Sequence, residues 1–343
     1  MQTMKDLGEL GFIERIRNAF PHNGSAVLGI GDDCAAIPID QQRSMLVSTD
    51  ILTEGIHFTA EISGFDLGYK SLAVNLSDIA AKGGRPTYCF LSVCLPSHTQ
   101  LSFVDEFIHG FSSLAKLHGV ALLGGDTSGS LGPITVSVTI MGEILHKNLK
   151  LRSAALAGDQ ICVSGPLGDS LLGLQLIQAN SELSKKLSKL NFKIPQNLKQ
   201  VLRQRHWRPT PQIQEGIFLS SLDSVHAMMD LSDGLKTDLA RMCKASACGA
   251  AIHLENIPLS SEAREFCGFL DWDPAEAGVV GGEDYQLLLT VAPNALQETQ
   301  KLFKGQFGRE LYCLGTIIEA NQGITYLRAG KKTDIQLDGF QHF

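Results

Sequence analysis

Residues 29–37 read GIGDDCAAI, so two adjacent aspartates, Asp32 and Asp33, stand between a glycine turn and a small apolar run. Two unit charges about 4 Å apart repel by roughly 4 kcal/mol at an effective dielectric constant of about 20. Paired acids at the edge of an apolar interior therefore oppose folding unless a positive group joins them. The stretch predicts a cation at this point of the fold.

The segments that follow this stretch alternate between strand-like and helix-like patterns. Apolar and β-branched runs predict strands at 25–31, 43–52, 86–96 and 133–144. Helical spacing of apolar residues predicts helices over 7–20, 68–84 and 101–119, of which the last two end on glycine. Strands that alternate with helices are typical of an α/β domain.

The pattern restarts after Glu143, which predicts a domain boundary near residue 150. A strand is expected at 159–165, and a glycine turn then leads into a helix within 165–180. The polar, lysine-rich segment 181–208 is typical of a solvated helix or an insertion. The chain has 343 residues, 44% of them hydrophobic, which is enough for two domains, at 1–150 and 151–343.

Composition excludes several classes of protein. No stretch reaches the roughly 18 continuous apolar residues of a membrane span, and the N-terminal MQTMKDLGEL has acids where a signal peptide has lysines. We therefore expect a cytoplasmic protein. The net charge of -7 argues against nucleic-acid binding. The eight cysteines form no CxxC pair and no zinc-ligand spacing, so reduced thiols are expected.

Acidic residues recur in otherwise apolar or glycine-rich stretches. The candidates are Asp32 with Asp33, Asp50, Asp78, Asp126, Asp230 with Asp233, and Glu283 with Asp284. Each alone is explained by a helix N-cap or a turn, but a cap needs no further acids around it. Mg²⁺ takes one or two carboxylates and completes its shell with water and phosphate oxygens. With oxygens of Ser48 and Thr49, the set suits several Mg²⁺ ions, and the absence of histidine and cysteine from it argues against zinc.

Standard phosphate-binding signatures are missing. No GxxxxGK[ST] occurs, and GIGDDC breaks the GxGxxG pattern at its last position. A nucleotide would have to be held by metals, helix N-termini and glycine amides. The turn GPLGDS at 165–170 is either such an amide cradle or a plain connection.

Ten motifs, in order along nearly the whole chain, resemble the thiamine-monophosphate kinase family. This family shares a superfamily with aminoimidazole ribonucleotide synthetase and selenophosphate synthetase. The motifs are GIGDDCA (29–35), VSTDILTEGIHF (47–58), AVNLSDIAAKGG (73–84), LLGGDT (122–127), LRSAALAGD (151–159), SGPLGDS (164–170), RPTP (208–211), DLSDGL (230–235), GGEDY (281–285) and GFQHF (339–343).

The resemblance implies a two-domain α/β fold (α+β, with mixed sheets) like that of aminoimidazole ribonucleotide synthetase. Residues 1–150 would bind ATP and Mg²⁺ and pair with a second copy in a homodimer, and residues 151–343 would close over the nucleotide. It also implies ATP-dependent phosphorylation of thiamine monophosphate to thiamine diphosphate, the last step of thiamine diphosphate biosynthesis, by direct in-line transfer assisted by several Mg²⁺ ions.

The resemblance further implies roles for individual residues. The metal ligands fall on Asp33, Ser48, Thr49, Asp50, Asp78, Asp126, Asp230 and Asp233. The ATP contacts fall on Gly125, Asp126, Arg152 and Ser232, and the contacts to the acceptor on His57 and Glu283. The acceptor oxygen of a phosphate is already anionic at neutral pH, so no catalytic base is expected.

This sequence departs from the family pattern at three places. The GGD motif continues as TSGS where the family often has a basic residue, and His118 stands where an aromatic residue is common. A substrate-side aromatic residue of some members aligns with Leu337, with Phe340 nearby. The rival hypotheses are another phosphotransferase of the superfamily, a Mg²⁺-dependent phosphohydrolase, and a non-catalytic nucleotide-binding protein.

Overall fold

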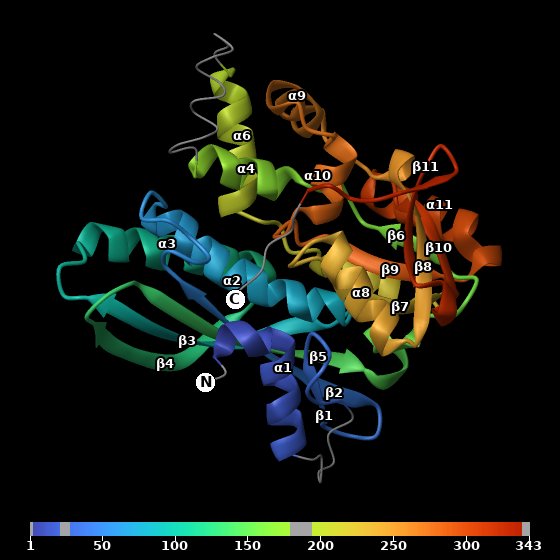
Figure 1. The fold of residues 1–343 in the computed structure, drawn as a ribbon. Helices are drawn as coiled ribbons and strands as arrows, with labels where there is room; N and C mark the ends of the chain where they lie inside the picture. Colours follow the sequence, from blue (N-terminus) through green and yellow to red (C-terminus); the bar gives the residue numbers. More distant parts are fainter. Residues whose placement is uncertain (1–2, 21–27, 179–193, 338–343) are drawn as a thin grey trace.

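The computed structural model describes residues 3–20, 28–178 and 194–337 (Figure 1). It contains two mixed sheets, each with helices packed against it, so the predicted α/β class with mixed sheets is confirmed. Within the described residues, no helix is both long enough and apolar enough to cross a bilayer.

The first sheet comprises five strands in the order β1-β2-β5-β3-β4, in which β3 and β4 run parallel and the other neighbours antiparallel. The strands are β1 (Ala35–Pro38), β2 (Arg43–Thr53), β3 (Arg85–Pro96), β4 (Ala121–Ser130) and β5 (Thr135–Leu145). Strand β4 lies at the edge, and nine of its ten residues are exposed.

Two long helices, α2 (Gly64–Ala81) and α3 (Leu101–His118), lie on one face of this sheet (Figure 1). They approach closely because Gly68 and Gly110 have no side chain: a Cβ there would lie 2.1 Å from the Phe107 carbonyl oxygen and 2.0 Å from that of Phe65. Fifteen residues of α2 are buried, since it also contacts β7 (Val225–Asp230) and α7 (Ile213–Ser220) of the second half. A further helix, α1 (Met4–Ala19), precedes the sheet and has a kink at Gly8.

The second sheet has seven strands in the order β12-β11-β8-β10-β6-β9-β7, and only β11 and β8 pair in parallel. The strands are β6 (Gln160–Val163), β7 (Val225–Asp230), β8 (Cys248–His253), β9 (Leu287–Val291), β10 (Tyr312–Glu319), β11 (Ile324–Arg328) and β12 (Lys331–Thr333). Its helices are α4 (Asp169–Ile177), α6 (Gln196–Trp207), α7 (Ile213–Ser220), α8 (Leu235–Ala245), α9 (Ser261–Leu270), α10 (Pro274–Val280) and α11 (Leu296–Phe307).

One large apolar core runs through both halves of the chain. It includes Leu46 and Ile140 of the first sheet together with Met228 and Leu289 of the second. A smaller core lies under α8, and a third joins α4, α6, α9 and α10. Because the largest core is shared, burial of apolar surface holds the two sheets together.

Local structure differs from the sequence prediction in four places. The segment 122–127, expected as a glycine turn, belongs to strand β4. Ser77 and Asp78, for which a helix N-cap was one explanation, lie in the last turn of α2 instead. Of the strand predicted at 25–31, residues 25–27 lie outside the described residues, and Leu28 and Ile30 form only isolated bridges. Residues 181–193 of the lysine-rich segment also lie outside, whereas 196–207 form α6, with a buried apolar face.

Candidate functional site

A cavity of about 260 Å³ lies where the two halves of the chain meet. Its walls come from β2 and α2 of the first half and from the segments after β7 and before β9 of the second. Seven of the predicted site residues line it: Asp50, His57, Asp78, Asp230, Ser232, Asp233 and Glu283.

The cation expected beside Asp32 and Asp33 is supplied by the chain itself. Lys82 Nζ lies 2.5 Å from Asp32 Oδ1 and 2.8 Å from Asp33 Oδ2, and it also donates to the Met228 carbonyl oxygen at 3.0 Å. Arg152 pairs with both carboxylates as well. Burial favours a raised pKa for Asp33, but the charges of Lys82 and Arg152 outweigh it and hold the pKa below its usual value. The sequence predicted a cation beside the two aspartates but did not identify Lys82 as its source.

Asp50, Asp78 and Asp230 form a second acidic group. Among the ion pairs of the described residues, none includes these three carboxylates. Burial raises the pKa of Asp230 to about 7, and the charge of Asp33 adds to the effect. Burial likewise raises the pKa of Asp50 to about 6, with a contribution from Asp233, and raises that of Asp78 well above its usual range. Such a group attracts positive charge.

Hydroxyl groups support two of these carboxylates. Ser48 Oγ lies 2.5 Å from Asp78 Oδ2 and 3.1 Å from the Asp33 carbonyl oxygen, so it connects the two acidic groups. Ser77 Oγ donates to Asp230 Oδ2 at 2.6 Å across the boundary between the halves. These bonds hold one carboxylate of α2 and one of β7 beside the same cavity.

Side chains alternate between the faces of a strand, and this alternation divides the predicted ligands. Ser48 and Asp50 lie on the helix-covered face of β2. Thr49 lies on the opposite face, where its Oγ1 donates to the Val138 carbonyl oxygen at 3.1 Å. The hydroxyl of Thr49 is therefore directed away from the cavity.

Gly125 and Asp126 lie on the exposed edge strand β4. The register pairs Asp126 with Ser92, Ser92 with Ser137, and Ser137 with Ile51, which places Asp126 on the open face that Thr49 shares. Asp126 accepts a hydrogen bond from the Thr127 N–H at 2.9 Å and does not line the cavity. The structure does not bring Gly125 and Asp126 together with the other predicted ligands.

The loop after β7 carries Ser232 and Asp233. Arg241 of α8 holds Asp233 at 2.5 Å and also pairs with Asp238 at 3.0 Å and with Glu9 of α1 at 3.6 Å. The carbonyl oxygen of Ser232 accepts from the Glu283 N–H at 2.7 Å. Helix α1 therefore reaches the wall of the cavity through Glu9.

Glu283 and His57, the predicted acceptor contacts, both line the cavity. Two further polar residues, Lys70 and His206, lie beside them. Lys70 Nζ lies 3.1 Å from the Glu283 carboxylate and donates to the His57 carbonyl oxygen at 3.2 Å. His206 Nδ1 lies 3.2 Å from Glu283 Oε2. The Glu283 backbone has φ 62°, and a non-glycine residue in that conformation costs of order 1–3 kcal/mol, which is typical of functional loops.

The ring nitrogens of the two histidines can be assigned from their partners. His57 Nδ1 accepts from the Thr53 N–H at 3.0 Å, so Nε2 carries the proton. Burial lowers the pKa of His206 to about 3, and the nearby charge of Lys70 acts in the same direction. His206 is therefore neutral, with Nε2 accepting from Lys70 at 3.5 Å and Nδ1 as the donor.

The glycine turn at 165–170 has its own ligand. Asp284 accepts from the Gly168 N–H at 2.5 Å and from the Ser170 N–H at 3.0 Å, at the start of α4. The amides of this turn therefore bind a carboxylate of the same chain, and a role toward a nucleotide stays a prediction. Burial, together with the charge of Asp169, raises the pKa of Asp284 to about 8.

The positions that depart from the family pattern lie away from the cavity. His118 is the last residue of α3, and Leu337 packs against the second and third cores, with its N–H donating to Glu276 at 3.1 Å. Phe340 lies outside the described residues.

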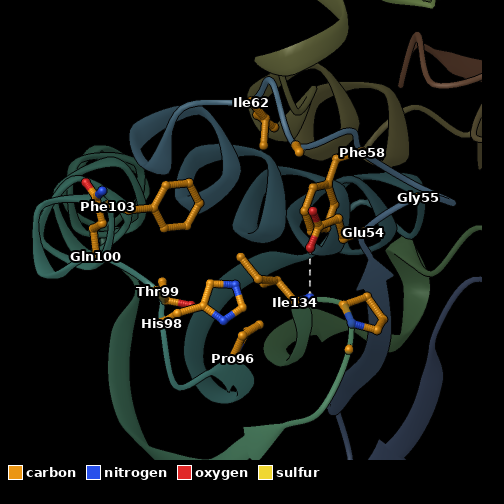
Figure 2. A pocket seen from close by; sticks show the side chains of 13 residues that line it. Glu54, Gly55, Phe58, Ile62, Pro96, His98, Thr99, Gln100, Phe103 and Ile134 are labelled. Carbon is orange, nitrogen blue, oxygen red and sulfur yellow. Dashed lines mark hydrogen bonds between the residues drawn. The ribbon is translucent and has the colours of Figure 1, made fainter.

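A second cavity, of about 600 Å³, lies where β2 and β3 end and β5 begins (Figure 2). Its lining is mainly apolar, with Phe58, Phe103 and Ile134. The Glu54 carboxylate accepts from the Ile134 N–H there at 3.0 Å. The segment 54–58 thus lies between the two cavities, since Ile56 and His57 line the first and Glu54 and Phe58 the second.

The donor set fits a hard cation such as Mg²⁺. Asp50, Asp78 and Asp230 offer carboxylate oxygens alone, in surroundings where their negative charges repel one another. Across the described ranges, no three acidic, histidine or cysteine side chains converge closely enough to hold one ion by themselves. Because Mg²⁺ normally takes one or two carboxylates plus phosphate and water oxygens, the carboxylates fit ions that share their shell with a phosphorylated ligand.

The chain resembles known proteins along most of its length. The family model of the N-terminal domain of AIR synthase related protein matches residues 31–144, and that of the C-terminal domain matches 157–328. A thiamine-monophosphate kinase of Buchnera aphidicola is 36% identical over 320 residues, which cover 92% of this chain and 93% of that protein. The chain belongs to the thiamine-monophosphate kinase family.

Two further relatives agree with this membership. A thiamine-monophosphate kinase of Salmonella typhimurium is 35% identical over 315 residues, covering 92% of this chain and 91% of that protein. The solved structure of AaThiL complexed with AMPPCP and TMP superposes with a TM-score of 0.82 at 30% identity, covering 100% of this chain and 99% of that one. The chain is accordingly an enzyme of the kinase class.

Three polar residues of the site have no counterpart among the residues predicted from sequence. Lys82 and Lys70 lie on or next to α2, within apolar sequence, and both are fully buried. His206 lies in the segment interpreted as a solvated helix or an insertion, which forms α6. Lys70 and Lys82 could have been found from sequence as lysines within an apolar helical pattern. A lysine buried in such a pattern is normally paired with an acidic residue.

Proposed function

We propose that this enzyme transfers the terminal phosphoryl group of ATP to thiamine monophosphate and forms thiamine diphosphate, the last step of thiamine diphosphate biosynthesis. One observation carries the proposal: the cavity between the halves combines a buried carboxylate group, Asp50, Asp78 and Asp230, with an acceptor corner at His57 and Glu283. Family membership and the AMPPCP and TMP ligands of the related structure support the choice of substrates.

The chemistry of the acceptor explains the composition of the site. A phosphate oxygen is anionic at neutral pH, so the obstacle is repulsion between two polyanions and not the removal of a proton. In-line positioning and neutralisation of charge lower such a barrier. Mg²⁺ ions held by these carboxylates would supply this neutralisation of phosphate charge.

The proposed holders of these ions are Asp33, Ser48, Asp50, Asp78, Asp230 and Asp233. Thr49 and Asp126 remain proposed holders too, but they lie on the open face of the first sheet, so an ion held there would be separate from the cavity. We assign Gly125, Asp126, Arg152 and Ser232 to ATP, since a guanidinium offers two parallel donors to phosphate. His57 would donate to the phosphate of the acceptor from Nε2, and Glu283 would face its cationic ring system. No side chain is assigned as a catalytic base.

We further propose a homodimer formed through the open face of the first sheet. Helices cover one face of that sheet. Ile51, Tyr88 and Phe90 are exposed on its other face. The edge strand β4 adds the exposed Leu122 and Leu123. An exposed apolar sheet face with an unpaired edge is typical of an interface. A second copy would also cover Asp126 and Thr49.

The division of labour between 1–150 and 151–343 is part of the proposal. The first part would bind ATP and Mg²⁺ and dimerise, and the second would close over the nucleotide. All eight cysteines are free, which supports a reducing compartment such as the cytoplasm.

The test is a product assay. The purified protein is incubated with ATP, Mg²⁺ and thiamine monophosphate, and the products are separated by chromatography. We expect thiamine diphosphate and ADP in equal amounts, and neither when Mg²⁺ is chelated. Release of free phosphate without thiamine diphosphate would indicate a phosphohydrolase, and binding of ATP without turnover would indicate a non-catalytic protein.

A further inference from the structure

Lys70 is a fully buried lysine at the centre of the acceptor corner. Its ammonium group contacts the Glu283 carboxylate at 3.1 Å, the His57 carbonyl oxygen at 3.2 Å and His206 Nε2 at 3.5 Å. Its side chain is 0% exposed, so it does not contact a ligand in the cavity itself. Any effect of Lys70 on a ligand must act through these neighbours.

The three neighbours come from distant parts of the chain. Lys70 belongs to α2, His57 follows β2, Glu283 precedes β9, and His206 lies near the end of α6. The Glu283 side chain keeps 23% of its surface exposed and lines the cavity, while Lys70 contacts its carboxylate from the buried side. One ammonium group thus connects the two halves at the acceptor corner.

The charges and contacts around Lys70 indicate that its function is to hold the Glu283 carboxylate in place. A buried lysine is costly unless it is paired, and an apolar side chain would fill the same space without that cost. Burial favours a raised pKa for Glu283, but the charge of Lys70 outweighs it and keeps the carboxylate ionised. His206, held by Ser170 Oγ at 2.9 Å, supports the other side of the same carboxylate.

We propose that Lys70 is a positioning residue of the acceptor site, whose buried ammonium group holds Glu283 and the His57 main chain in the arrangement that binds the cationic acceptor. His206 supports this arrangement. The inference rests on the proposed function, because the acceptor is the one named there. It predicts that Lys70 determines affinity for thiamine monophosphate and has little effect on affinity for ATP.

The experiment measures KM for each substrate in Lys70→Met, Glu283→Gln and the double variant. We expect Lys70→Met to raise KM for thiamine monophosphate about tenfold or more and to change KM for ATP less than twofold. Because Lys70 and Glu283 act as one unit, their effects should not multiply, and the double variant should raise KM for thiamine monophosphate by far less than the product of the two single effects. The double variant also leaves no unpaired charge, so it stays measurable if Lys70→Met alone folds poorly.

Lys150→Met is the matched control. Lys150 is also a buried lysine, but its Nζ donates to the Leu222 carbonyl oxygen at 3.0 Å and does not line the cavity. We expect both KM values to be unchanged in this variant. Equal changes for both substrates in Lys70→Met, or multiplied effects in the double variant, would overturn the inference alone. A wild-type protein that forms no thiamine diphosphate would overturn the proposed function and, with it, this inference.

Discussion

Replacing Lys82 by Met removes the buried ammonium group that lies between Asp32 and Asp33. Met fills a similar volume, so the change tests charge and not packing. The lost contacts are 2.5 Å and 2.8 Å long and belong to side chains that are 0% and 3% exposed. Removing one partner of such a buried pair costs about 3–5 kcal/mol, because the remaining charge is left in the interior. At about 2–4 °C per kcal/mol, this cost corresponds to a fall in Tm of roughly 6–20 °C.

Thermal melting at pH 7 measures this cost. The pH is suitable because the pKa of Asp33 is lowered and that of Lys82 is raised in the fold, with the charges of the opposite partners outweighing burial in each case. The stabilisation that Asp33 contributes is present above the pKa of the unfolded state and is lost as pH falls through the pKa of the folded state. The stabilisation that Lys82 contributes is lost only as pH rises through its pKa in the folded state.

Two further variants control this result. Asp32→Asn together with Lys82→Met should recover part of the lost stability, since one unpaired charge is gone. Lys150→Met, which loses a hydrogen bond to a carbonyl oxygen, should cost only about 1–3 kcal/mol. If Lys82→Met melted no lower than Lys150→Met, the view that Lys82 neutralises the aspartate pair would be refuted.

Three other predictions concern the carboxylates and the open sheet face. Asp78→Ala or Asp230→Ala should lower kcat by about 10² or more with the fold intact by circular dichroism, since charge stabilisation is lost, and near wild-type turnover would count against the metal-holding role. Burial, with the charge of Asp33, raises the pKa of Asp230 to about 7, so the native state binds a proton at Asp230 more tightly than the unfolded state does. The free energy of unfolding should therefore fall as pH rises from about 4 to 7. Calorimetry without metal should show this fall reduced in Asp230→Asn, and an unchanged profile would argue against the shift. Leu122→Lys on β4 should give a monomer in light scattering where the wild type is a dimer, and a dimeric variant would place the interface elsewhere.

The order of the elements was predictable because local patterns decide it. The apolar periodicity of α2 and α3 and the β-rich runs of β2, β3 and β5 carry their own signal, and the family motifs add the mixed-sheet class. Strand β4 was missed because its sequence, with three glycines among ten residues, is typical of a turn. Pairing with β3 decides its structure, and sequence does not show that partner.

The site was predictable in its acids and less so in its cations. Asp50, Asp78, Asp230 and Glu283 were named from their positions, and the structure places them around one cavity. The lysines Lys82 and Lys70 and the neutral His206 were not named, because each depends on a contact between residues far apart in sequence. The placement of Thr49 and Asp126 on the open face likewise follows from register, which the motifs do not encode.

The central claim is that carboxylates from both halves of the chain gather divalent ions around the phosphates. Crystals grown with an ATP analogue and Mn²⁺ in place of Mg²⁺ test it directly, because Mn²⁺ gives anomalous signal. We predict ion peaks shared between phosphate oxygens and the carboxylates of Asp33, Asp78 and Asp230. A bound nucleotide whose ions contact none of these three side chains would contradict the account.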